Sequence, residues 1–330
     1  MAEKRLSLEK YKTGILNGDR VLLGRAITLI ESNRKEDEAI SLALINSIFP
    51  FTGNSFRIGI SGIPGVGKST FIEALGKHLT GQGKKVAVLA IDPSSKLTGG
   101  SILGDKTRMN ELSRNELAFI RPTPASNTVG GVAGKTYETV LLCEAAGFDY
   151  ILIETVGVGQ SETEVHNLTD FFLLLMIAGM GDELQTMKKG IMELADGIVI
   201  NKADGNNIEK AKKTAAEMRQ TLHLLSSQQN KEEPTVMVCS SKENTGIPEI
   251  ILLLHDFKKK ALSKGSWTRK RATVTLQNFF RELERQLLKD FYHNTFVEKN
   301  IKKIENEVAG GKITPQAAAI LLLENYKNKK

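Results

Sequence analysis

The sequence predicts an α/β fold in which a mostly parallel central sheet is flanked by helices, with helical extensions at both ends of the chain. Short apolar runs alternate with helical segments from residue 56 to about residue 257, which is typical of parallel strands buried on both faces. Helical spacing of apolar residues precedes and follows this region. We therefore expect an N-terminal helical extension over 1–55, a central domain over 56–260 and a C-terminal helical arm over 261–330.

The N-terminal extension is predicted to be helical because a capping residue precedes an apolar stripe. Asp19 can accept hydrogen bonds from the first free backbone N–H groups of a helix. The apolar residues that follow recur at helical spacing: Leu22, Leu23, Ala26, Ile27 and Ile30. Another part of the protein must cover this stripe.

Six apolar runs of the central region are predicted to be strands. They are Arg57–Ser61, Val86–Ile91, Tyr150–Ile153, Phe171–Ile177, Gly197–Ile200 and Thr235–Cys239. Each is short, and helical segments separate them, as in a doubly wound parallel sheet. The polar residues that follow these strands are therefore expected at one edge of the sheet, where ligands bind in open α/β folds.

A glycine-rich segment follows the first of these strands. Gly62-Ile63-Pro64-Gly65-Val66-Gly67-Lys68-Ser69, followed by Thr70, matches the pattern G-x-x-x-x-G-K-[ST]. Its backbone N–H groups can surround phosphates, Lys68 can reach the terminal phosphates, and Ser69 can offer its hydroxyl to Mg²⁺. The helix predicted from Thr70 to His78 adds a dipole that favours anions. The segment predicts a P-loop NTPase fold that binds a nucleoside triphosphate.

Two carboxylates follow strands at the same edge. Asp92 comes after Val86–Ile91, and Glu154 comes after Tyr150–Ile153. At these positions we expect Asp92 to bind Mg²⁺ or the attacking water, and Glu154 to hold a magnesium ligand as a Walker B carboxylate does. Helix capping or turn formation is the alternative role for both.

Two further segments are predicted to respond to the nucleotide. In the segment from Thr155 to Glu162, we expect the backbone N–H of Gly157 to approach the γ-phosphate. Gln160 could orient the attacking water, although its register relative to Gly157 is not the one expected for that role. In the glycine-rich segment from Thr98 to Arg108, Asp105 can join the magnesium shell when the loop closes. A plain surface loop in which Asp105 pairs with a neighbouring cation is the alternative.

The segment after the fifth predicted strand indicates which base is bound. Asn201-Lys202-Ala203-Asp204 matches the N-K-x-D motif, in which the Asp204 carboxylate accepts from both N1–H and the 2-amino group of guanine. Adenine lacks the 2-amino group, so ATP would leave this carboxylate poorly paired, at a cost of about 1–3 kcal/mol. Lys202 is expected to cover the base or brace the phosphate loop, and Asn201 to tie loops together.

A second segment is expected to close the base pocket. Ser240-Ser241-Lys242 follows the last predicted strand and resembles the S-A-K element, whose backbone contacts the guanine O6. Together with Asp204, this element favours GTP and GDP, with Mg²⁺, over ATP.

Helical spacing returns after Gly265. One long amphipathic helix is predicted from its apolar stripe: Leu276, Phe280, Leu283, Leu287 and Phe291. A final helix is predicted to have Thr314 as N-cap and Pro315 at its first position. The stretch Ala318–Leu323 is too apolar for an exposed helix, so we expect it to pack on the protein or on a second copy of it.

Composition excludes several classes of protein. With 41% hydrophobic and 25% charged residues, the 330-residue chain has the composition of an ordinary globular protein. The start MAEKRLSLEKYK lacks an apolar signal segment, and the stretch Phe171–Ala178 is too short to cross a bilayer, so we expect a cytoplasmic protein without a membrane partner. Cys143 and Cys239 lie in apolar surroundings and are predicted to be buried, reduced thiols.

The net charge of +7 could attract nucleic acid or an acidic partner. The basic residues cluster at Lys258, Lys259, Lys260, Lys264, Arg269, Lys270 and Arg271. We interpret this cluster as a solvated linker and helix face, because no nucleic-acid-binding module accompanies it. No nucleic-acid partner is therefore expected.

Taken together, the motifs resemble those of the G3E GTPases of the SIMIBI class, and within them the methylmalonyl-CoA mutase-associated GTPases, the MeaB/ArgK family. The resemblance rests on the motifs GIPGVGKST at 62–70, DPSS at 92–95, TGGSILGDKTRM at 98–109, ETVGVGQSE at 154–162, GMGDELQTMKKG at 179–190 and NKAD at 201–204. It covers nearly the whole chain. Lys96-Leu97 departs from the family pattern, in which arginine and a small polar residue are expected.

The resemblance implies a homodimeric GTPase that serves as a chaperone for an adenosylcobalamin-dependent acyl-CoA mutase. GTP binding and hydrolysis would gate cofactor loading and protect the mutase, and the C-terminal helices would form the dimerisation arm. The segment 179–190 resembles an additional switch, in which Asp182, Glu183, Gln185 and Lys188 would relay nucleotide state to the mutase.

Two other functions are considered beside this one. An ATP-using kinase of periplasmic amino-acid-binding proteins, an older annotation of the family, would gain nothing from a guanine-reading carboxylate. A nickel-insertion chaperone needs clustered Cys and His ligands, whereas the five histidines are scattered and the two cysteines form no C-x-x-C or C-x-C pair.

Overall fold

The computed structural model describes residues 5–32, 34–92, 109–124, 131–155, 161–179, 189–226 and 233–327. The chain divides into two compact units, the first formed by Met1–Ser126 and Gly131–Val274, the second by Asn127–Gly130 and Thr275–Lys330. The N-terminal helices thus belong to the same unit as the sheet. The three-part division expected from the sequence stays a prediction.

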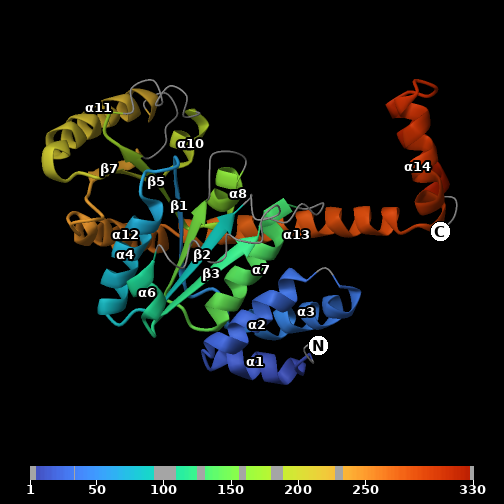
Figure 1. The fold of residues 1–330 in the computed structure, drawn as a ribbon, viewed down its shortest axis with the longest axis horizontal. Coiled ribbons are helices and arrows are strands. Elements are labelled where there is room, and N and C mark those ends of the chain that lie inside the picture. The colour runs from blue at the N-terminus through green and yellow to red at the C-terminus, as the bar shows by residue number, and fades with distance from the viewer. Residues whose placement is uncertain are drawn as a thin grey trace. The chain divides into compact units, whose positions relative to one another are not determined.

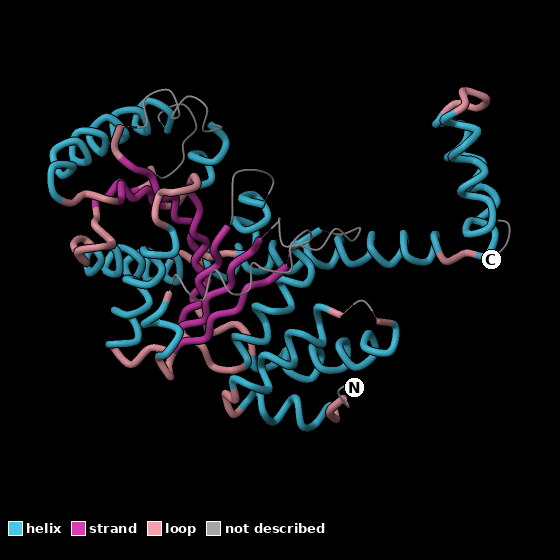
Figure 2. The backbone as a smooth tube through the Cα atoms, in the orientation of Figure 1, coloured by secondary structure: helices cyan, strands magenta, loops and turns pink. Residues whose placement is uncertain are grey.

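A seven-stranded parallel sheet forms the centre of the first unit (Figures 1 and 2). Its strands are β1 (Phe56–Gly62), β2 (Val86–Asp92), β3 (Ala118–Pro124), β4 (Tyr150–Thr155), β5 (Phe171–Ile177), β6 (Gly197–Asn201) and β7 (Thr235–Val238). The strand order is β3-β2-β4-β1-β5-β6-β7. In this order β1 lies between β4 and β5, so the connections from β1 and β4 leave in opposite directions. The crevice at the carboxyl end of β1 is therefore the expected ligand site.

The predicted α/β fold with a parallel sheet is confirmed, and six of the seven strands match predicted runs. Strand β3 was missed because Arg121, Pro122 and Pro124 interrupt its apolar sequence. Proline cannot donate to a strand ladder, so it is tolerated mainly at sheet edges. β3 is an edge strand that pairs only with β2, which explains why this sequence can form it.

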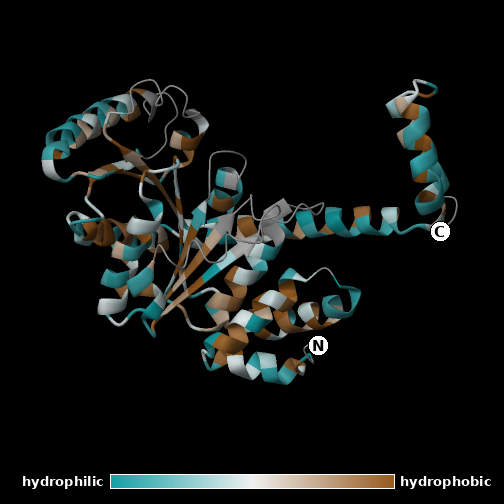
Figure 3. Cartoon of the chain, in the orientation of Figure 1, coloured by the Kyte–Doolittle hydropathy of each residue, from teal (hydrophilic) through white to brown (hydrophobic). Residues whose placement is uncertain are grey.

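Three helices cover one face of the sheet: α4 (Lys68–Gly81), α6 (Asn110–Arg114) and α12 (Ile247–Ser263). Alternate residues of β1, Phe56, Ile58 and Ile60, point into this layer and are fully buried. The strands are largely brown in Figure 3, as expected for a sheet covered on both faces.

Helices α7 (Gly131–Ala145) and α8 (Ser161–Leu168) cover the other face near β1, β2 and β4. Helices α10 (Lys189–Leu194) and α11 (Ile208–Ser226) cover that face near β5, β6 and β7. The short 3-10 helix η2 (Gly205–Asn207) connects β6 to α11. The sheet is thus enclosed between two helical layers.

The N-terminal segment forms α1 (Leu8–Leu16), α2 (Arg20–Glu31), α3 (Lys35–Ile48) and the 3-10 helix η1 (Phe49–Phe51). Asp19 caps α2 as predicted, because its side chain accepts from the N–H groups of Val21 at 2.8 Å and Leu22 at 3.0 Å. The predicted apolar stripe is covered by α1, α3 and α7. This contact joins the N-terminal helices to the core of the first unit.

Helix α13 (Ser266–Tyr292) begins in the first unit and continues into the second, where α14 (Thr295–Ala309) and α15 (Pro315–Lys327) pack together. The hydroxyl of Thr314 accepts from the N–H of Ala317 at 3.3 Å, in agreement with the predicted N-cap. Within the described part of the chain, every helix is too short or too polar to span a bilayer.

The basic cluster around the start of α13 is in part the solvated helix face that was expected, because Lys259, Lys260, Lys264 and Arg269 are exposed on α12, on α13 or at their short junction. Lys258 lies over the rings of Phe56 and Trp267, at 5.6 and 5.4 Å from their centroids. Arg271 pairs with the buried Asp170 at 2.7 Å. Lys270 also donates to the carbonyl oxygen of Asp170 at 3.0 Å. The cluster therefore combines exposed cations with three half-buried cations that contact neighbouring residues of the first unit.

Candidate nucleotide-binding site

The phosphate loop connects the carboxyl end of β1 to the first turn of α4. Its three glycines have positive φ angles, 152° at Gly62, 79° at Gly65 and 94° at Gly67. A Cβ on Gly62 would lie 2.5 Å from the carbonyl oxygen of Leu175, and one on Gly67 would lie 2.9 Å from Nδ2 of Asn201. Both backbone angle and close approach require glycine at Gly62 and Gly67.

Lys68 is the first residue of α4, and its side chain folds back over the loop. Its Nζ donates to the carbonyl oxygens of Gly62 at 2.7 Å and Ile63 at 3.2 Å. Burial lowers the pKa of Lys68, and the nearby carboxylates of Glu154 and Glu162 act in the opposite direction. A cation is thus held at the mouth of a loop whose backbone can bind phosphate.

The structure brings Ser69 and Glu154 together at the carboxyl edge of the sheet. The Ser69 hydroxyl donates to Oε1 of Glu154 at 3.4 Å, and Glu154 is 5% exposed. Glu154 lies within β4, where it pairs with Ile60, and not beyond the strand as expected, since the strand continues to Thr155. Thr155 donates to the hydroxyl of Ser61 at 3.0 Å, which fixes the ends of β4 and β1 together.

This pair of oxygen ligands fits Mg²⁺, which is commonly held by one or two protein side chains together with phosphate oxygens. Among the described residues there is no group of three or more His, Cys, Asp or Glu placed to hold a metal. Asp92 is the last residue of β2 and lies at the same sheet edge. Asp105 and Gly157 lie outside the described residues.

Asn201 connects three loops at the base side of the site. It ends β6, and its Nδ2 donates to the carbonyl oxygen of Val66 in the phosphate loop at 3.0 Å. Its Oδ1 accepts from the backbone N–H of Ser241 at 3.2 Å and from the hydroxyl of Ser241 at 2.8 Å. The side-chain amide of Asn201 therefore holds the phosphate loop against the two segments that we call the base-recognition segments, 201–204 and 240–242.

Asp204 is oriented by a contact that the sequence did not predict. The hydroxyl of Ser240 donates to Oδ2 of Asp204 at 2.6 Å, and the backbone N–H of Glu243 donates to the same hydroxyl at 3.1 Å. Only a backbone role was expected for Ser240. Its position next to Asp204 depends on the pairing of β6 with β7, which neither motif contains.

The two lysines of these motifs are exposed. Lys202 has a positive φ of 60°, and its Cε lies 3.8 Å from the position that a Cβ on Gly67 would take. Lys202 therefore lies beside the phosphate loop, where it can brace it. Lys242 follows Ser241 on the surface, and Thr70 is exposed in the first turn of α4.

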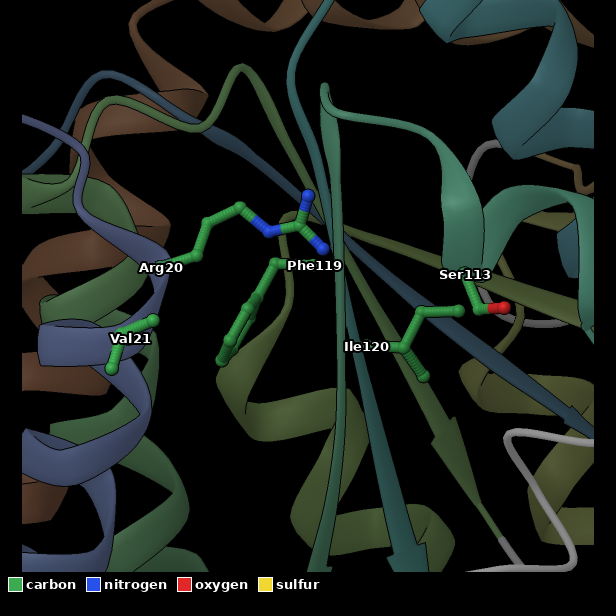
Figure 4. A pocket seen from close by; sticks show the side chains of 5 residues that line it. All are labelled: Arg20, Val21, Ser113, Phe119 and Ile120. Carbon is green, nitrogen blue, oxygen red and sulfur yellow. The ribbon is translucent and has the colours of Figure 1, made fainter.

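A hollow of about 530 Å³ lies elsewhere in the first unit, beside the edge strand β3 (Figure 4). It is lined by Arg20, Val21, Ser113, Phe119 and Ile120. Phe119 and Ile120 point to opposite faces of β3 in Figure 4, so the hollow follows the strand edge. None of these residues belongs to the phosphate loop or to the base-recognition segments.

Comparisons with known proteins agree with this arrangement. The sequence model of the family described as methylmalonyl Co-A mutase-associated GTPase MeaB matches residues 23–295. The protein named GTPase ArgK of Escherichia coli (strain K12) is 44% identical over 307 residues, which cover 93% of each chain. The Mus musculus protein named methylmalonic aciduria type A homolog, mitochondrial, is 41% identical over 332 residues, covering 98% of this chain and 80% of that protein.

A solved structure is similar over the whole length. The crystal structure of a LAO/AO transport system kinase has a TM-score of 0.75 and 35% sequence identity, and the match covers 99% of this chain and 100% of that chain. The family model spans the phosphate loop, the magnesium-binding candidates and the base-recognition segments. This chain therefore belongs to the MeaB family of methylmalonyl-CoA mutase-associated GTPases.

Proposed function

We propose that this GTPase uses GTP binding and hydrolysis, with Mg²⁺, to gate the loading of adenosylcobalamin into an acyl-CoA mutase and to protect that mutase from inactivation. The assignment of GTP depends mainly on the hydrogen bond from Ser240 to Asp204. Next to it, the side-chain amide of Asn201 donates to the phosphate loop, which connects the expected base site with the phosphate site. A carboxylate held in one orientation can accept from both N1–H and the 2-amino group of guanine. The same carboxylate finds no such pair of donors on adenine.

In the proposed site each residue of the phosphate loop and its neighbours has a separate role. Backbone N–H groups of 62–70 bind the phosphates, and the Lys68 ammonium stabilises charge that develops on the transferred phosphoryl group. Ser69 and Glu154 would hold Mg²⁺, which would supply positive charge to offset the charge of the phosphates. Metal binding by Asp92 and Asp105, and the approach of the Gly157 N–H to the γ-phosphate, remain predictions.

The mutase is proposed as the partner on the basis of family membership. The family is described as mutase-associated, and the mouse relative is named after methylmalonic aciduria. Strand β5 ends at the same edge of the sheet as β1, and the segment 179–190, which follows β5 in the sequence, is proposed to respond to the nucleotide. Its residues Asp182, Glu183, Gln185 and Lys188 lie outside the described part of the chain.

A homodimer is proposed because the second unit exposes large apolar side chains. On α13 these are Leu276, Phe279, Phe280, Leu283, Leu287, Leu288 and Tyr292, and on α15 they are Ile320, Leu321 and Leu323. Leu276, Leu283 and Leu287 are each at least 45% exposed within the single chain. An apolar stripe at helical spacing is typical of a helix that packs on a partner.

The proposed function is tested by binding to a purified adenosylcobalamin-dependent methylmalonyl-CoA mutase. We expect a complex whose affinity, and whose acceptance of adenosylcobalamin, differ between a non-hydrolysable GTP analogue and GDP. The variant Lys68→Ala should abolish that difference, because the cation that reaches the terminal phosphates is missing.

Two outcomes would oppose the proposal. The absence of any complex in all nucleotide states would remove the mutase as partner. ATP-dependent phosphorylation of a periplasmic amino-acid-binding protein, with no preference for guanine, would instead support the kinase function in the description of the similar crystal structure.

A further inference from the structure

Asn207 lies just beyond the motif NKAD and contacts it twice. Its side-chain Nδ2 donates to the carbonyl oxygen of Lys202 at 2.7 Å. Its backbone N–H donates to the carbonyl oxygen of Asp204 at 3.0 Å. Asn207 is the last residue of η2, so both hydrogen bonds join the motif to a residue that is not part of it.

The backbone of Lys202 has a conformation that L-residues rarely adopt. Its φ is 60°, and among the described residues only Lys202 and Asn244 combine a positive φ with a side chain. In this left-handed region Cβ comes too close to the following carbonyl oxygen, so such a residue persists only where neighbouring contacts hold it. The hydrogen bond from Asn207 is such a contact, because it restrains the peptide that follows the strained residue.

The residues on either side of Lys202 are held by other parts of the first unit. Asn201 ends β6 and donates to the phosphate loop at 3.0 Å. The backbone N–H of Ala203 donates to the carbonyl oxygen of Cys239, directly after β7, at 3.0 Å. Asn207 therefore completes a turn whose neighbouring positions are already fixed by the sheet and the phosphate loop.

Asp204 occupies the N-cap position of η2 without using its carboxylate as a cap. An aspartate at this position commonly accepts from the N–H of the second or third helical residue, but within the described part of the chain the Asp204 carboxylate accepts no such hydrogen bond. The N–H of Asn207, the third residue of η2, donates to the main-chain carbonyl oxygen of Asp204 instead. The carboxylate is thereby left to the Ser240 hydroxyl, at 2.6 Å, and to a ligand.

We propose that Asn207 is a positioning residue for guanine recognition, which holds the turn 201–204 in the conformation that presents the Asp204 carboxylate to the base. This inference rests on the proposed function, in which Asp204 accepts from N1–H and the 2-amino group of guanine. Without the Asn207 amide, the Lys202 peptide can leave the left-handed conformation, and Asp204 moves with it. The nucleotide must then restore the turn as it binds, so affinity that depends on Asp204 is lost.

The ratio of the affinities for GDP and inosine diphosphate tests this role. Inosine diphosphate has the N1–H of guanine but lacks the 2-amino group, so the ratio measures the hydrogen bond to that group. In Asn207→Ala the ratio should fall by about fivefold, because a relaxed turn binds the two nucleotides alike. Competition against a fluorescent guanine nucleotide at fixed Mg²⁺ concentration measures both affinities. A purely structural role for Asn207 would lower both by the same factor and leave the ratio unchanged, which would overturn the proposal.

The adjacent Asn206 provides the matched control, because it is the same type of residue in the same short helix and is exposed. Asn206→Ala should keep the ratio within about twofold of the wild-type ratio. A fall as large as that in Asn207→Ala would contradict the role of Asn207, since the effect would then not depend on its contacts.

A second variant tests the hydrogen bond itself. Asn207→Asp keeps the size of the side chain but replaces the Nδ2 donor by an oxygen, which cannot donate to the Lys202 carbonyl. We expect the ratio to fall by at least as much as in Asn207→Ala. A wild-type ratio in Asn207→Asp would show that the amide donor is not required.

A substitution at Lys202 tests whether Asn207 acts through the strained backbone. Glycine adopts a φ of 60° without strain. When Asn207→Ala is combined with Lys202→Gly, the ratio should therefore fall by less than about twofold relative to Lys202→Gly alone. An undiminished fivefold fall in that background would refute this route of action.

Two further measurements separate this inference from the proposed function. Equal affinities of the wild-type protein for GDP and inosine diphosphate would remove the guanine role of Asp204, and the inference would fail with it. If the wild type prefers GDP and Asp204→Asn loses that preference, whereas Asn207→Ala retains it in full, only the inference fails.

Discussion

At the residue scale, the proposed specificity for guanine depends on one carboxylate, that of Asp204. Asp204 is half-buried, and one of its oxygens accepts from Ser240 at 2.6 Å. This contact restricts rotation of the carboxylate before the nucleotide arrives, which reduces the entropy lost on binding. The motif NKAD predicted Asp204 as the acceptor for the base. The pairing of β6 with β7 places Ser240 beside it, where the Ser240 hydroxyl donates to the carboxylate.

Replacement of Asp204 by asparagine should change base preference from guanine towards xanthine. The amide of Asp204→Asn presents a donor where the carboxylate presented an acceptor, and the 2-oxo group of xanthine can accept from it. We expect GTP affinity to fall by about tenfold to 100-fold while affinity for xanthosine triphosphate rises. Competition against a fluorescent guanine nucleotide measures both changes.

The control for this substitution is Glu209→Gln, which removes a carboxylate from the exposed first turn of α11 a short distance along the chain. It should leave both affinities unchanged. Retention of full guanine preference by Asp204→Asn would refute the assignment of Asp204 to the base.

At the scale of elements, a buried ion-pair network joins the N-terminal part of α13 to the amino end of the sheet. Arg271 donates through Nε and Nη2 to the two carboxylate oxygens of Asp170 at 2.8 and 2.7 Å, and its guanidinium lies 4.7 Å from the ring centroid of Trp267. Oδ2 of Asp170 also accepts from the backbone N–H of Arg57 at 2.9 Å. These contacts connect α13 with β1 and with the start of β5.

Removal of Arg271 should be strongly destabilising. In Arg271→Ala the carboxylate of Asp170, which is 4% exposed, loses its bidentate partner, and breaking a buried pair in this way costs about 3–5 kcal/mol. Urea unfolding followed by circular dichroism measures the free energy of unfolding. Because the pair lies within the first unit, the effect should not depend on protein concentration.

The neighbouring Arg269 provides the control. The side chain of Arg269 is exposed and donates to the carbonyl oxygen of Lys264 at 3.1 Å, so Arg269→Ala should change stability by less than about 0.5 kcal/mol. Equal free energies of unfolding for the two variants would show that the network does not stabilise the N-terminal part of α13.

At the scale of the whole molecule, the exposed apolar stripe of α13 is proposed to be covered by a second copy of the chain. The double variant Leu283→Glu, Leu287→Glu places charge on this stripe. In a two-fold symmetric dimer each change occurs twice, and each buried leucine contributes about 1.5–3 kcal/mol. We therefore expect the dimer dissociation constant to rise by at least about 100-fold, as measured by sedimentation velocity over a range of concentrations.

The matched control is Gln286→Glu, which adds a negative charge to the same helix at an exposed polar position. It should leave the dissociation constant nearly unchanged. A wild-type protein that sediments as a monomer at all concentrations would contradict the proposed dimer.

Local motifs were sufficient to predict much of the fold and of the candidate site. The parallel sheet, the phosphate loop and the helix caps at Asp19 and Thr314 all depend on residues that are close in sequence. Strand β3 was missed because its tolerance of Arg121 and two prolines depends on its place at the sheet edge. The ion pairs of Arg271 were missed because Asp170 lies far away along the chain.

The sequence by itself determined that this chain folds as a parallel α/β protein with a phosphate loop and a guanine-type recognition motif. Hydrophobic periodicity and short glycine-rich motifs carry that information, since both act over a few residues. Only the tertiary structure decided that Ser240 contacts Asp204 and that Asn201 joins the phosphate loop to the segment at Ser241. Such contacts follow from the order of strands in the sheet, which brings together chain segments that no local pattern relates.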